Sequence, residues 1–169
     1  MNADEKERMQ ARGVRYRVVE GDLLRQDVDV IVNAWNRNII PWWLLIPQGI
    51  SGAIKREGGY EPFREVARHG AIPLGHAVRT GAGRLPFKAI IHVAGINMLW
   101  QSSEYAVRKS VQSAMEIVRQ HGDKSVAFPL IGAGTGGHKE SRVLSWMQDV
   151  LEHEEPCDGD VILVRYKKA

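Results

Sequence analysis

The sequence predicts an α/β fold with a largely parallel sheet. Strand-like and helix-like segments alternate along the chain, as they do when crossover helices connect parallel strands. The clearest unit is an apolar run over residues 126–131 that enters a turn with glycines at positions 132, 134, 136 and 137. An amphipathic helix pattern follows this turn, with apolar residues on one face: Val143, Leu144, Met147, Val150 and Leu151.

The remaining elements follow from short apolar runs and helical spacing. We expect strands over residues 15–20, 28–32, 89–94 and 160–166, each bounded by glycine or polar residues. A helix is expected over residues 102–121, with Gly122 as its stop. Its apolar residues recur at helical spacing: Val107, Val111, Ala114, Met115 and Val118.

Length and composition predict one domain. The chain has 169 residues, 44% of them hydrophobic and 25% charged, with a net charge of +3. We assign residues 1–14 to a tail or lead-in, and residues 15–169 to the domain. The absence of a long apolar run and of a signal-peptide pattern, with the single cysteine Cys157, predicts a cytoplasmic monomer that does not meet a membrane. Neither the histidines nor Cys157 show a metal-ligand spacing, so no metal or cofactor is expected.

Small and polar residues follow several of the predicted strands. They are Asp22, the Asn33 and Asn36 pair, Gly95 and the 132–137 glycine turn. Because ligands of open α/β sheets bind beyond the carboxyl ends of the strands, these segments predict one shared site. A glycine turn before a helix is a typical phosphate-binding arrangement, but it also closes strand-to-helix corners without any ligand.

Five short motifs resemble those of the macrodomain family in their order and separation. They are residues 21–23 (Gly-Asp-Leu), 32–36 (Val-Asn-Ala-Trp-Asn), 49–54 (Gly-Ile-Ser-Gly-Ala-Ile), 92–95 (His-Val-Ala-Gly) and 129–137. The resemblance covers nearly the whole chain. It implies a three-layer α/β/α sandwich around a mixed, mostly parallel sheet that binds ADP-ribose. Many family members remove ADP-ribose from proteins, from nucleic acids or from acetylated ADP-ribose.

The resemblance also implies roles for individual residues. Asp22 would accept a hydrogen bond from adenine, although an aspartate here also caps a turn at Leu23. Asn36 would hold the distal ribose and act as the catalytic residue, although an asparagine is also common where a loop begins. The further expected ligand-binding residues are Leu23, Asn33, Gly49, Ile50, Ser51, Gly52, Ile131, Gly132, Ala133, Gly134, Thr135 and Gly136, the glycine turns enclosing the diphosphate.

Three positions depart from the family pattern. Ser51 stands where efficient hydrolases of the family often carry an aspartate, and serine is no general base at neutral pH. Gly136 stands where an aromatic residue usually wedges the distal ribose. The loop over residues 37–48 is longer than usual and carries Trp42 and Trp43. These would plug the sheet end, wall the distal ribose or stack on a base of a nucleic-acid substrate.

We therefore expect an ADP-ribose-binding protein that hydrolyses mono-ADP-ribosyl linkages on a protein or nucleic acid. Water would attack the distal ribose, and a phosphate of the substrate would replace the missing carboxylate. Catalysis without a protein base is reasonable, because positioning alone lowers a barrier by several kcal/mol. The alternatives are a non-catalytic reader of ADP-ribose and a phosphatase acting on ADP-ribose 1″-phosphate.

Overall fold

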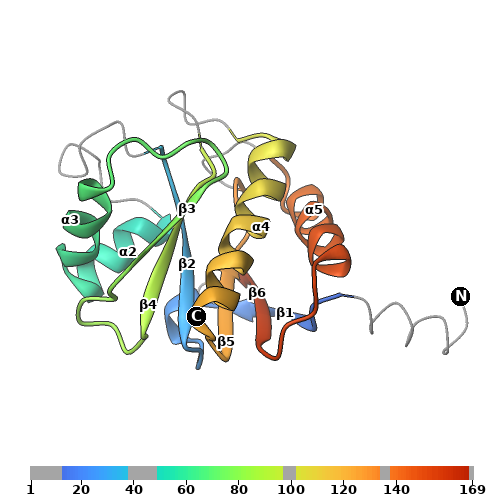
Figure 1. Ribbon diagram of the computed structural model, residues 1–169, viewed down its shortest axis with the longest axis horizontal. Helices are drawn as coiled ribbons and strands as arrows, with labels where there is room; N and C mark the ends of the chain where they lie inside the picture. The colour runs from blue at the N-terminus through green and yellow to red at the C-terminus, as the bar shows by residue number, and fades with distance from the viewer. Residues whose placement is uncertain (1–12, 38–48, 97–101, 134–137, 168–169) are drawn as a thin grey trace, which may run out of the picture.

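The computed structural model describes residues 13–37, 49–96, 102–133 and 138–167 (Figure 1). Its elements, in chain order, are β1 (Tyr16–Gly21), a 3₁₀ turn η1 (Leu23–Arg25), β2 (Val30–Trp35), α2 (Gly49–Gly58), α3 (Glu61–Arg68), β3 (Ala77–Thr80), β4 (Ala89–Ala94), α4 (Glu104–His121), β5 (Ser125–Pro129), α5 (Glu140–His153) and β6 (Asp160–Tyr166).

The strands of the described residues form one six-stranded sheet in the order β1-β6-β5-β2-β4-β3. Every neighbouring pair is parallel except β3 and β4, which run antiparallel at one edge. The predicted mixed, mostly parallel sheet is therefore confirmed. The parallel strands place their carboxyl ends at one edge of the sheet, which is where ligands of such sheets bind.

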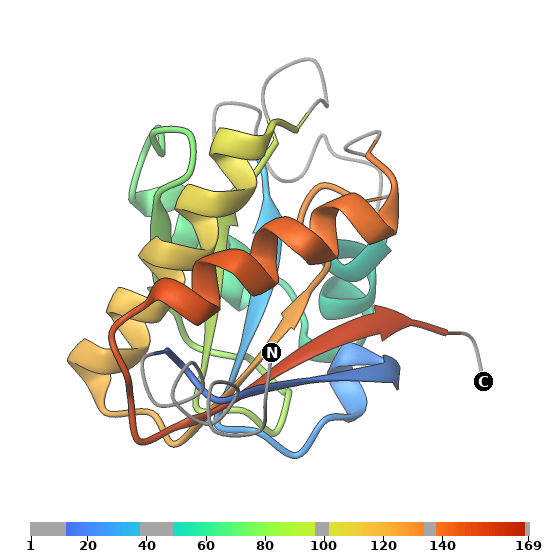
Figure 2. The same ribbon diagram turned by 90° about the vertical axis from the view of Figure 1, so that its right-hand side faces the viewer.

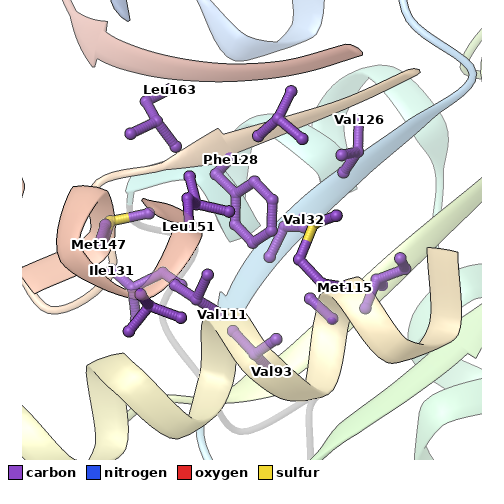
Figure 3. Close-up of a cluster of buried hydrophobic side chains, with 14 of the residues drawn as sticks. Val32, Val93, Val111, Met115, Val126, Phe128, Ile131, Met147, Leu151 and Leu163 are labelled. Atoms are coloured by element: carbon purple, nitrogen blue, oxygen red, sulfur yellow. The ribbon is translucent and has the colours of Figure 1, made fainter. Parts of the chain in front are cut away.

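Helices cover both faces of the sheet, which confirms the three-layer arrangement. Figure 1 shows α2 and α3 on one side of the strands and α4 and α5 on the other, and Figure 2 shows α5 crossing the sheet. Figure 3 shows how Val111 and Met115 of α4, with Met147 and Leu151 of α5, pack on Phe128. Complete burial of a side chain such as Phe128 stabilises the fold by about 2–3 kcal/mol.

The two faces are sorted by the alternation of side chains along each strand. On β2, Val30 and Val32 belong to the apolar cluster under α4 and α5. Ile31 and Trp35 belong to the opposite cluster, under α2 and α3. Asn33 shares their parity, so its side chain lies on the α2 face of the sheet.

Helix α4 is capped by a side chain at its start and ends at the predicted glycine. The Ser103 hydroxyl accepts a hydrogen bond from the Ala106 amide at 3.1 Å, which caps the first turn. Gly122 ends the helix in the left-handed conformation, with φ 64° and ψ 29°. The prediction of Gly122 as the stop is confirmed.

Some boundaries and elements differ from the predictions. The strand expected over residues 28–32 is β2 at Val30–Trp35, so Asn33 lies within the strand instead of after it. Asn33 can lie within the strand because both ends of its side-chain amide are hydrogen-bonded inside the protein. Strand β3 and helix α3 were not predicted. Strand β3 gave no clear apolar run, because it is a short edge strand that includes Arg79 and Thr80.

Candidate functional site

The carboxyl edge of the sheet brings together most of the predicted site residues that the structure describes. Asp22 follows β1, Asn36 follows β2, and Ile131 to Ala133 lie just beyond β5. Helix α2 begins at the same edge, because the Ser51 hydroxyl contacts Asn33 of β2. The segments expected to share a site therefore lie along the same edge of the sheet.

Asp22 caps the turn after β1. One of its carboxylate oxygens accepts a hydrogen bond from the Leu24 amide at 2.9 Å, and its backbone carbonyl accepts one from Gln26 Nε2 at 2.9 Å. The capping role weighed from the sequence is thus present, and it engages one carboxylate oxygen. Leu23 is only 3% exposed and packs in the apolar cluster under α2 and α3.

Asn36 sits where the backbone is held on both sides. The Gly95 amide donates to the Trp35 carbonyl at 3.1 Å. On the other side, Arg37 and Ile72 are joined by a backbone hydrogen bond at 2.8 Å and by Arg37 Nε donating to the Ile72 carbonyl at 3.2 Å. The buried Asn36 is therefore carried on a backbone whose position is well constrained.

Asn33 supports the start of α2 from below. It is fully buried, and its Oδ1 accepts a hydrogen bond from Ser51 Oγ at 2.9 Å. Its Nδ2 lies 3.1 Å from His92 Nδ1. Both ends of the amide are thus used inside the protein, and the half-buried Ser51 is the member of this group that reaches the edge.

His92, the first residue of the 92–95 motif, is a functional candidate whose role was not predicted from the sequence. It is completely buried on β4, and its Nε2 lies 2.9 Å from Thr80 Oγ1. Burial, and to a smaller extent the charge of His69, lower the pKa of His92 to about 3. A histidine inside an otherwise apolar strand is the sequence signal that points to such a buried, neutral ring.

The start of α2 has the character of an anion-binding site. Gly49 has a φ of 54°, a left-handed conformation that favours glycine. The first helical turn, which includes Ile50, Ser51 and the buried Gly52, carries no acidic residue. The amides of this turn have no partner within the helix, and no carboxylate of the turn opposes the helix dipole.

The glycine turn after β5 is held against the start of α4. Gly132 has a φ of 83°, and a Cβ built on it would lie 2.5 Å from Ser102 Oγ. The Ser102 hydroxyl donates to the Gly95 carbonyl at 2.8 Å, while the backbones of Ala133 and His138 form an isolated bridge. Ile131 is fully buried and anchors this turn in the core. Gly134, Thr135, Gly136, Trp42 and Trp43 lie outside the described residues.

Lys55 was not predicted as part of the site, although it lies one helical turn after Ser51. Its residue is 6% exposed, and its ammonium lies 5.0 Å from the centre of the Phe63 ring and 5.5 Å from that of Trp35. Burial lowers the pKa of this ammonium. Lys55 also lines a cavity of about 460 Å³ with Arg56, Arg64 and Arg84, which contains none of the predicted site residues.

Over residues 13–37, 49–96, 102–133 and 138–167, no three His, Cys, Asp or Glu side chains are grouped so as to hold a metal ion. Within the same ranges, no helix has the length and apolar character needed to cross a membrane.

Sequence comparisons match the chain to known proteins over most of its length. The sequence model of the Macro domain family matches residues 32–147. A protein of Aquifex aeolicus is 38% identical over 150 residues, covering 88% of each chain. A Pantoea vagans protein named O-acetyl-ADP-ribose deacetylase 1 is 34% identical over 144 residues, covering 80% of each chain.

Structural comparisons agree with the sequence comparisons. A macrodomain mutant of Oceanobacillus iheyensis, solved with ADPR, superposes with a TM-score of 0.75 at 26% identity, covering 88% of this chain and 83% of that one. The same macrodomain solved with ADP superposes with a TM-score of 0.73 at 25% identity, covering 90% and 84%. With this sheet order, this arrangement of helices and these matches, the chain belongs to the macrodomain family.

Proposed function

We propose that this protein binds ADP-ribose at the carboxyl edge of its sheet and hydrolyses mono-ADP-ribosyl linkages. The observation that carries the proposal is the convergence of Asp22, Asn36, the start of α2 and the Gly132 turn on that one edge. Together they offer a carboxylate for adenine, an amide for ribose, and two backbone turns for the diphosphate. The family membership and the relatives solved with ADPR and ADP support this ligand.

In the proposed reaction, Asn36 holds the distal ribose and the two turns hold the diphosphate. A water molecule attacks the anomeric carbon, a C–O bond forms with water oxygen, and the bond to the macromolecule breaks. The proton of the water passes by way of a substrate phosphate to the departing group. Ser51 takes no proton in this scheme, because its hydroxyl already donates to Asn33 and a serine is not basic at neutral pH.

Relatives named O-acetyl-ADP-ribose deacetylase favour a second substrate of the same site. With O-acetyl-ADP-ribose, water would attack the ester carbonyl and release acetate and ADP-ribose. The same ribose-holding Asn36 and the same diphosphate turns would position this substrate. We further propose that residues 15–169 form one domain and that the protein works as a cytoplasmic monomer.

Calorimetry and turnover assays test the proposal together. ADP-ribose is expected to bind at one site, and AMP to bind more weakly because it lacks the distal ribose and one phosphate. Mass spectrometry with O-acetyl-ADP-ribose, ADP-ribose 1″-phosphate, and mono-ADP-ribosylated protein and nucleic acid then identifies the reaction. Lack of binding at millimolar ADP-ribose would refute the site, whereas tight binding with no turnover would leave a non-catalytic reader.

A further inference from the structure

We infer that a directional chain of hydrogen bonds through Thr80, His92 and Asn33 makes Ser51 Oγ an obligatory acceptor, whose partner in the ligand is a hydroxyl of the distal ribose and not a phosphate oxygen. This inference rests on the proposed ADP-ribose site. It assigns His92 and Thr80 as positioning residues, which act on the ligand only through Asn33 and Ser51.

The direction of the chain starts from a backbone carbonyl. The Gly81 carbonyl has no proton, so the Thr80 hydroxyl must donate to it across their 2.9 Å contact. Having used its only proton, Thr80 Oγ1 accepts in its other contact. His92 Nε2, 2.9 Å away, is therefore the donor and carries a proton.

The neutral imidazole of His92 fixes which atom donates and which accepts in its contact with Asn33. With its proton on Nε2, His92 presents an unprotonated Nδ1, which accepts from Asn33 Nδ2 at 3.1 Å. The opposite amide orientation would set the Asn33 oxygen against the Nδ1 lone pair. Asn33 Oδ1 consequently faces Ser51, and the Ser51 hydroxyl donates to it at 2.9 Å.

The end of the chain restricts what Ser51 can bind. Its single proton is held by Asn33, so only lone pairs of Ser51 Oγ remain for a partner at the edge. The diphosphate of ADP-ribose offers only acceptors at neutral pH, while the ribose hydroxyls and the adenine amine are donors. The adenine is proposed at Asp22 after β1, and two strands separate β1 from β2, about 14 Å at ordinary strand spacing. The proximal ribose is bonded to that distant adenine, so a hydroxyl of the distal ribose is the donor that remains.

The same direction excludes Ser51 as a nucleophile. An activated serine needs a base that takes its proton, and the group that accepts the Ser51 proton is a neutral amide oxygen. Asn33 is fully buried and is itself held by the neutral ring of His92.

Matched ligands test the contact at Ser51. Calorimetry of wild type and Ser51→Ala with ADP-ribose and ADP separates the ribose from the diphosphate, because ADP lacks the distal ribose. We expect Ser51→Ala to weaken ADP-ribose binding about 5- to 10-fold and to leave ADP binding within about twofold. An equal loss for both ligands, or no loss for either, would overturn the assignment.

Nuclear magnetic resonance of the histidine rings tests the direction of the chain without any ligand. We expect His92 to carry its proton on Nε2 in wild type and in Thr80→Ser, and to lose this preference in Thr80→Val. A wild-type ring protonated on Nδ1 would overturn the inference. If wild type binds neither ligand, the proposed function and the ribose contact both fail, and the ring measurement still decides the direction.

Discussion

Among single residues, His92 is fully buried and neutral, and this couples folding to pH. Its pKa is about 3 in the folded protein and about 6.5 in an unfolded chain, so the unfolded state binds more protons between these values. The contribution of neutral His92 to the free energy of unfolding is therefore largest above about pH 6.5, and it falls as the pH drops below that value. From pH 7 to pH 5 the free energy of unfolding should decrease by about 2 kcal/mol.

Urea denaturation of His92→Gln measures this coupling. Glutamine keeps a neutral donor near the ring Nε2 position, and the variant should lose most of the decrease between pH 7 and pH 5. His121→Gln is the control, because His121 is exposed at the end of α4. An unchanged pH dependence in His92→Gln would contradict the assignment to His92.

Asn36 and Ser51 should differ in their effects on turnover. Asn36 is proposed to act at the reacting ribose, whereas binding is spread over the whole ligand. Asn36→Ala is expected to lower kcat by about 100-fold while ADP-ribose affinity falls about tenfold or less. Ser51→Ala should lower kcat by much less, since its hydroxyl is neither base nor nucleophile. Steady-state kinetics on an O-acetyl-ADP-ribose or ADP-ribosyl substrate gives both values, and equal losses in kcat would refute the division of roles.

At the scale of elements, the turn after β5 depends on Gly132. Alanine there would take a left-handed conformation and place its Cβ 2.5 Å from Ser102 Oγ and 2.7 Å from Ser102 Cβ. Gly132→Ala should cost about 2–3 kcal/mol of unfolding free energy. The matched variant Gly122→Ala has a similar φ of 64° but nothing within 4 Å, so it should cost only about 1 kcal/mol. Thermal and urea denaturation check the difference, and equal losses would show that the contact with Ser102 is unimportant.

At the scale of the whole molecule, one ion pair ties the antiparallel edge strand to the far end of α4. The two terminal guanidinium nitrogens of Arg79, on β3, donate to the carboxylate of Asp123, at 2.5 and 3.2 Å. The Asp123 side chain is only 3% exposed. Arg79→Ala would leave this carboxylate buried without its cation, and should destabilise the protein by about 3 kcal/mol.

The pair between Arg15 and Asp160 is the control for this prediction. Its side chains are 72% and 73% exposed and 3.8 Å apart, so Arg15→Ala should change the unfolding free energy by less than about 0.5 kcal/mol. Chemical denaturation of both variants gives the comparison. A loss from Arg79→Ala no larger than that from Arg15→Ala would show that the edge strand does not depend on the pair.

Local patterns in the sequence were enough to predict the α/β fold, the largely parallel sheet and the end of α4 at Gly122. Buried runs such as residues 89–94, and the Ser103 to Gly122 helix, owe their form to apolar periodicity and to capping residues a few positions apart. Gly49 and Gly132 likewise predicted turns, and both glycines have positive φ values in the structure. These features need no information from distant parts of the chain.

The tertiary structure alone decided how polar residues are used. Asn33, His92 and Thr80 lie on three different strands, and they meet only because the sheet places β2 beside β4 and β4 beside β3. Strand pairing is set by contacts between residues far apart in sequence, which no local pattern reports. For that reason the sequence by itself identified the strands that became β2 and β4 and singled out Asn33, while the part of Thr80, the direction of the hydrogen bonds and with it the chemistry open to Ser51 depended on the folded sheet.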